Sequence, residues 1–178
     1  MKIRTDFVTN SSSSSFVSLH ITSAKLAQIF AEANNETEIE GLEILEGGKG
    51  IKFRVDEVEI APPQSINDTI NALVELVRWA EKFFNAGHGL EAKLKQDEKD
   101  ILNDIEAVEF DFGEEGWGEA FGYEDFEDVC YKLQEEVEEE PAAIRIHHFV
   151  SFTKDGNEKR GEKYTYILAD GETEITLE

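Results

Sequence analysis

The spacing of hydrophobic residues changes along this chain, and each change marks a predicted element. Segments 2–8 and 16–21 alternate between apolar and polar residues, or nearly so, as half-buried strands do. The alternation returns at Ala143 and continues through three predicted strands with turns at 155–157 and 170–171. We therefore expect strands near both termini, with a three-stranded meander at the C-terminal end.

Two more strand patterns lie between these ends. Apolar residues in 42–45 and 51–60 flank a Gly-Gly-Lys-Gly turn at 47–50, which predicts a hairpin. Val108, Phe110 and Phe112 alternate with acidic residues and predict a further strand.

Four segments show the period of three to four that is typical of helices. Ser23 is a predicted N-cap for a short helix that ends near Asn34. Ser65 and Asp68 are spaced as a capping pair at the start of the strongest helix. A weaker pattern covers 90–105, and the spacing over 126–137 predicts a clean amphipathic helix. We expect one face of the strongest helix to be mostly buried, namely Ile66, Ile70, Leu73, Val77, Ala80 and Phe84, with Val74, Leu76 and Phe83 widening it.

Together these elements predict an α+β fold with a mostly antiparallel sheet, strands near both termini, and three to four helices packed against the sheet. A chain of 178 residues with 40% hydrophobic residues has enough material for one core. No linker or repeat divides it, so we expect a single domain over residues 1–178.

The formal net charge of −23 is concentrated in one region. Residues 106–140 hold 15 Asp or Glu against a single basic residue, Lys132. Such a field repels phosphate backbones and anionic membranes, so we expect neither nucleic-acid nor membrane binding. No apolar stretch is long enough to span a bilayer, the start of the chain lacks a signal-peptide pattern, and Cys130 is the only cysteine, so we expect a cytoplasmic protein.

The glycine-rich stretch 111–123 is the strongest candidate for a binding loop, because aromatic and acidic residues alternate with glycines there. Its spacing misses the dinucleotide fingerprint and fits a calcium loop poorly. An ordered connection whose aromatic rings pack on the core is the simpler interpretation, and a lip that binds a peptide or a cation is the alternative. The candidate binding residues are Glu114, Glu115, Trp117, Glu119, Phe121 and Tyr123.

Metal and nucleophile patterns are absent from the sequence. His147 and His148 are adjacent and would point to opposite faces of a strand, so one metal ion could not readily take both. There is no nucleophile elbow or phosphate loop, and Cys130 lies on the apolar side of its predicted helix. We therefore expect no metal, no cofactor and no catalytic residue.

The serine run 11–15 lies between two predicted strands and reads as a loop. Its backbone N–H groups, with Arg4 nearby, suggest a weak anion site at Ser12, Ser13, Ser14, Ser15 and Arg4. The leader KIRTDFVTNSSSSSF resembles an N-terminal element of uncharacterised bacterial proteins whose remaining sequences differ from one another. The resemblance implies a bacterial source and a common partner that recognises or processes the N-terminus. It implies no enzymatic or binding activity for particular residues of this chain.

The function most consistent with these observations is a non-enzymatic binding or interaction protein whose acidic face docks a basic protein. Two alternatives stay open. The carboxylates of 106–140 could imitate phosphates as a nucleic-acid decoy. A hydrolase or transferase could instead use an acid pair from Asp111, Glu114, Glu115 and Glu119.

Overall fold

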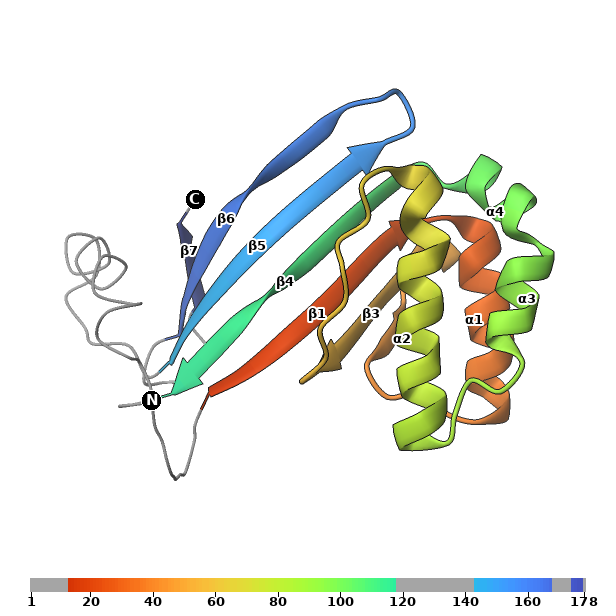
Figure 1. Ribbon diagram of the computed structural model, residues 1–178, viewed down its shortest axis with the longest axis horizontal. Coiled ribbons are helices and arrows are strands. Elements are labelled where there is room, and N and C mark those ends of the chain that lie inside the picture. Colours follow the sequence, from red (N-terminus) through yellow and green to blue (C-terminus); the bar gives the residue numbers. More distant parts are fainter. Residues whose placement is uncertain (1–12, 118–142, 168–173, 178) are drawn as a thin grey trace. The chain divides into compact units, whose positions relative to one another are not determined.

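A computed structural model describes residues 13–117, 143–167 and 174–177 (Figure 1). These residues form four α-helices and a seven-stranded sheet of order β2-β3-β1-β4-β5-β6-β7. Strand β2 pairs antiparallel with β3, and β6 pairs antiparallel with β7. The predicted α+β fold with a mostly antiparallel sheet is confirmed.

The elements have the following bounds. The strands are β1 (Ser13–Thr22), β2 (Leu42–Ile44), β3 (Gly50–Asp56), β4 (Ala107–Trp117), β5 (Ala143–Thr153), β6 (Glu158–Ile167) and β7 (Glu174–Leu177). The helices are α1 (Ala24–Glu36), α2 (Thr69–Phe84), α3 (Leu90–Gln96) and α4 (Glu98–Asp104), with short 3-10 turns η1 (Glu46–Gly48) and η2 (Ile66–Asp68).

The chain divides into two compact units. A helical unit comprises residues 17–111 and 149–160, and a strand unit comprises residues 1–16, 112–148 and 161–178, of which the structure describes a part. Strands β1, β4, β5 and β6 contribute residues to both units. The single domain expected over 1–178 stays a prediction.

In the helical unit the helices cover one face of the strands (Figure 1). Alternate strand residues point into the core on that face, as the period of two requires. Helix α1 packs against β3, and the rings of Phe30 and Phe53 meet edge to face with 6.2 Å between their centroids. The strand residues of this core are Val17, Leu19, Ile21, Ile51, Phe53, Val55, Val108, Phe110, Val150 and Phe152.

The N-terminus of α1 is capped from two directions. The Ser23 hydroxyl oxygen accepts a hydrogen bond from the Leu26 N–H at 3.2 Å, as the sequence predicts. Asp104 at the end of α4 accepts from the Ser23 hydroxyl at 2.7 Å and from the Lys25 N–H at 2.9 Å. Both hydrogen bonds hold the pKa of Asp104 below its usual value, and the bond from Ser23 has the larger effect. This carboxylate therefore ties α4 to the start of α1.

Helix α2 only partly follows its predicted pattern. Leu73, Val77 and Ala80 are buried as expected, but Phe83 is 53% exposed and Phe84 is 45% exposed. The prediction that these two rings belong to the buried face is therefore wrong. They lie in the last turn, where Asn85 ends the helix in a left-handed conformation with φ 53°.

Several boundaries also differ from the sequence-based expectation. β1 begins at Ser13, so Ser13, Ser14 and Ser15 belong to a strand and not to a loop. β4 continues to Trp117, so the first half of the expected glycine-rich loop is strand. The 90–105 pattern forms two short helices with a break at Asp97.

Other expectations are confirmed or lie outside the described residues. The hairpin of β2 and β3 and the meander of β5, β6 and β7 are present. The strand predicted at 2–8 and the helix predicted at 126–137, which contains Cys130, lie outside the described residues.

Candidate functional site

The residues singled out from the glycine-rich stretch do not form a loop where the structure describes them. Glu114, which is exposed, lies in β4 together with Glu115 and Trp117. Glu119, Phe121 and Tyr123 lie outside the described residues. Ser12 and Arg4 of the suggested anion site also lie outside them. Both sites stay predictions.

The adjacent histidines His147 and His148 contact different neighbours in the strand unit, as expected of consecutive strand residues. His147 Nε2 lies 3.0 Å from the Thr165 hydroxyl, and its ring meets Phe16 edge to face. His148 stacks on Phe112, with 5.2 Å between the ring centroids, and its Nδ1 lies 3.4 Å from Glu162 Oε1. Within the described ranges there is no group of three or more potential metal ligands.

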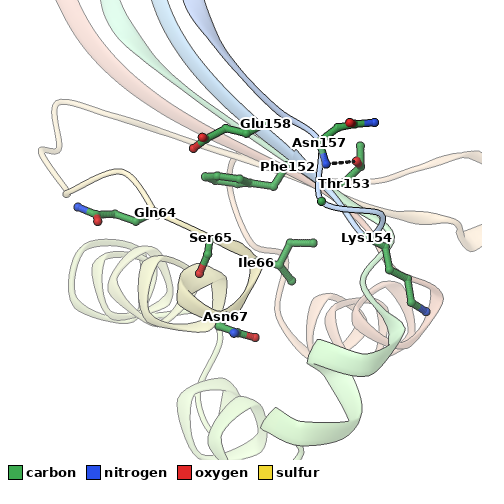
Figure 2. Close-up of a pocket in the computed structure, with 10 residues that line it drawn as sticks. Gln64, Ser65, Ile66, Asn67, Phe152, Thr153, Lys154, Asn157 and Glu158 are labelled. Atoms are coloured by element: carbon green, nitrogen blue, oxygen red, sulfur yellow. Dashed lines mark hydrogen bonds between the residues drawn. The ribbon is translucent and has the colours of Figure 1, made fainter.

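A hollow of about 370 Å³ opens in the helical unit between the segment entering α2 and the turn that joins β5 to β6 (Figure 2). Phe152 lies against it, and its rim carries neutral polar side chains such as Ser65 and Asn157. The Lys154 ammonium donates to the Asn103 carbonyl at 3.2 Å. Glu158 is the one carboxylate among the described residues that line it, so this hollow does not supply the acid pair that a hydrolase would need.

A second hollow, of about 490 Å³, lies in the same unit beside the last turn of α2. Residues 38–42, which connect α1 to β2, line one part of it, and Phe84 lines another. We call this hollow the acidic groove, because Glu38 and Glu40 are exposed there beside the half-exposed ring of Phe84.

The connection that lines the acidic groove is held firmly in place. The Ile39 side chain is buried, with 1% exposure, and its N–H donates to Asn34 Oδ1 at 2.8 Å. The Gly41 carbonyl accepts from the Arg54 N–H at 2.9 Å. A Cβ at Gly41 would lie 2.0 Å from the Arg54 carbonyl oxygen, so only glycine permits this approach. Glu38 and Glu40 therefore flank a fixed anchor and not a loose loop.

The charged side chains that line the acidic groove, Glu38 and Glu40, are both negative. Residues 26–48 contain no Lys, Arg or His. The exposed acids from the end of α1 to the start of η1 are Glu36, Glu38, Glu40, Glu43 and Glu46. Two cations of β3 lie opposite this stretch: Lys52 pairs with Glu43 in the β2–β3 register, and the Arg54 N–H bonds to the Gly41 carbonyl. The groove thus combines negative charge with an exposed aromatic ring.

The two rings at the end of α2 have different surroundings. Phe83 stacks on Trp79, with 4.4 Å between the ring centroids, and the Lys82 ammonium lies 5.2 Å from its centroid. Phe84 lines the acidic groove, and Phe83 does not. The sequence missed this site because Phe84 continues the core period and because Glu38 and Glu40 lie in a short connection without periodicity.

Family models, curated proteins and solved structures were compared with this chain, and none of them matches. None of the helices in the described segments is long and apolar enough to cross a membrane. The case for a function therefore depends on the geometry and charge of the chain itself.

Proposed function

We propose that this protein is a non-enzymatic, cytoplasmic binding protein whose acidic groove docks a basic segment of a partner protein. The observation that carries the proposal is the half-exposed ring of Phe84 beside Glu38 and Glu40 on a connection fixed by Ile39 and Gly41. This keeps the function expected from composition and assigns it to a specific surface.

An aromatic ring beside carboxylates suits a lysine or arginine side chain. The cationic head pairs with the carboxylates, while the ring face attracts the cation or covers its aliphatic stem. A net charge of −23 raises the local concentration of basic partners and speeds their association. The same charge disfavours anionic ligands.

The two alternatives have less support from the described residues. The decoy relies on carboxylates of residues 106–140, most of which lie outside the described part of the chain. The hydrolase or transferase relies on Glu119, also outside it, and on Asp111, Glu114 and Glu115, for which no cleft is described. Neither has an observation comparable to the acidic groove.

A fluorescence anisotropy titration tests the proposal. The probe is a labelled peptide in which Lys and Val alternate, and the controls are versions with Gln or Glu in place of Lys. We expect saturable binding of the Lys peptide alone, weakening as salt is added because the attraction is electrostatic. Equal binding of the Gln peptide would overturn the proposal, as would no binding of the Lys peptide.

Two variants assign the binding to the groove. Phe84→Ala should weaken binding by about tenfold, as loss of a buried aromatic contact does. The matched control is Phe83→Ala, which removes an equally large exposed ring that does not line the groove and should change affinity little. Wild-type affinity in Phe84→Ala would contradict the assignment.

A further inference from the structure

Some backbone N–H and C=O groups of the edge strand β2 point away from β3, the strand with which it pairs. Hydrogen bonds join Arg54 N–H to the Gly41 carbonyl and Leu45 N–H to the Gly50 carbonyl, each at 2.9 Å. In an antiparallel pair, hydrogen-bonded and non-hydrogen-bonded pairs alternate, so Glu43 also bonds toward β3. The backbone groups of Leu42 and Ile44 therefore point outward.

These outward groups lie at the end of the sheet. Among the strands that the structure describes, β2 is terminal in the order of the sheet. The Leu42 N–H donates to the Ile39 carbonyl at 3.2 Å, which leaves the Leu42 carbonyl and both backbone groups of Ile44 directed outward. An extended segment beside β2 could make three hydrogen bonds to them, as in recognition by β-strand addition.

The two faces of β2 define the side chains that such a segment needs. Leu42 and Ile44 pair with Phe53 and Ile51, which are core residues, so they share the apolar face that the helices cover. Glu43 pairs with Lys52 on the opposite, exposed face. A segment that adds to β2 would therefore meet an apolar face and an acidic face at alternate positions.

Proteins commonly protect an open edge with charged side chains, lysine above all. The part of β6 outside its printed register with β7, residues 158–163, carries the cations Lys159, Arg160 and Lys163 together with the acids Glu158 and Glu162. β2 instead carries Glu43 and lies between Glu40 and Glu46. Two copies of β2 would bring these acids together, so the edge disfavours its own copy and attracts a basic strand.

We propose that the basic partner adds to β2 as a strand in which aliphatic residues alternate with Lys or Arg, with one end of the segment reaching the acidic groove beside Leu42. This inference rests on the proposed function, because the groove supplies the charge selection. The β2 edge adds a requirement for an extended backbone and for an alternating pattern.

Backbone methylation of the probe peptide tests strand addition. The alternating Lys-Val peptide is N-methylated either at all its Val residues or at all its Lys residues, because each set of amides points to one edge of an extended strand. Methylation of the amides that point toward β2 should weaken binding by about tenfold, because their hydrogen bonds to β2 are lost. Methylation of the amides that point away from β2 should leave the affinity nearly unchanged. A peptide of the same composition, with the lysines in one block and the valines in another, should also bind more weakly.

Amide hydrogen exchange of the protein supplies the second measurement. Saturation with the unmethylated peptide should slow exchange at Ile44 and leave Glu43, already bonded to β3, nearly unchanged. Equal binding of both methylated peptides with no protection at Ile44 would overturn strand addition, while loss of affinity in Phe84→Ala would still support the groove.

Two further outcomes would also overturn strand addition. Absence of binding by any basic peptide would remove the proposed function together with this inference. Protection of Ile44 in the free protein, accompanied by a concentration-dependent dimer in sedimentation, would assign the edge to a second copy of the chain.

Discussion

The rings of Phe16 and His147 meet edge to face, with 5.5 Å between their centroids and 85° between their planes, although their strands are not neighbours. β4 lies between β1 and β5 in the sheet, and Gly113 of β4 runs against the backbone of Ile146 and His147. Because glycine has no side chain, the backbone of β4 can approach the backbone of β5 this closely. The ring contact between Phe16 and His147, together with the hydrogen bond between His147 and Thr165, links three strands of the strand unit.

Gly113→Ala should destabilise the protein by about 1 to 3 kcal/mol, because an added Cβ would lie 1.8 Å from the Ile146 carbonyl oxygen. Urea unfolding measures the change. The control is Glu114→Ala, which alters an exposed side chain of the same strand and should change the free energy of unfolding by less than about 0.5 kcal/mol. Equal stabilities of the two variants would show that the strands can separate at this point without cost.

A second prediction separates the buried and exposed parts of α2. Leu73→Ala should lower the free energy of unfolding by about 2 to 5 kcal/mol, because Leu73 is fully buried. Phe84→Ala should cost less than about 1 kcal/mol, because much of that ring already contacts water. Chemical denaturation of both variants checks the pair, and a larger loss for Phe84→Ala than for Leu73→Ala would return Phe84 to the core.

The periodicity of the sequence predicted the fold because most elements bury one face. Alternating residues in β3 and β5 and the three-to-four spacing in α2 each mark a side that packs on the core, and burial was predicted correctly for Leu73. The strand at Ser13–Ser15 was missed because pairing with a neighbouring strand requires no apolar side chain. The contact between Phe16 and His147 could not be predicted, because it depends on the order of the strands in the sheet, which places only β4 between β1 and β5.

The third prediction concerns Asp104, whose carboxylate caps α1. Asp104→Asn should reduce stability at neutral pH by about 1 to 2 kcal/mol, because a charged acceptor at a helix N-terminus is lost. Asp100→Asn, on the exposed side of the same helix, is the control and should have little effect.

The pH dependence of the Asp104→Asn difference follows from the lowered pKa of Asp104. A carboxyl group whose pKa is lower in the folded than in the unfolded chain stabilises the fold fully above its ordinary value of 3.8. This stabilisation is lost as the pH falls through the lower pKa of the folded chain. The difference between wild type and Asp104→Asn should therefore shrink in acid. A difference that stays constant down to acid unfolding would contradict the role of the charge.

The fourth prediction is that the protein does not bind duplex DNA or RNA at physiological salt. With a net charge of −23, it has no basic stripe in its sequence that could release counterions from a phosphate backbone. A gel-shift titration provides the measurement. Salt-sensitive binding at micromolar protein would contradict the prediction.

The acidic groove lies in a different part of the sequence from the residues that composition singled out. Composition predicted an acidic protein that attracts basic partners, and the strongest acidic run drew attention to 106–140. The acidic groove is built instead from the short connection that contains Glu38 and Glu40 and from Phe84, which are far apart in the sequence. Only the fold brings them together, and the burial of Ile39 is what holds the connection in place.

The most direct test of the proposed function compares two pairs of substitutions that change the net charge equally. Glu38→Gln with Glu40→Gln neutralises the acidic groove, while Glu98→Gln with Asp100→Asn neutralises two exposed acids of α4. The measurement is the dissociation constant of the labelled Lys-Val peptide for each double variant at one salt concentration. We expect the groove pair to weaken binding by about tenfold or more and the α4 pair to change it less than about twofold. Equal weakening by the two pairs would show that the peptide senses only the overall charge, and would contradict a docking site at the acidic groove.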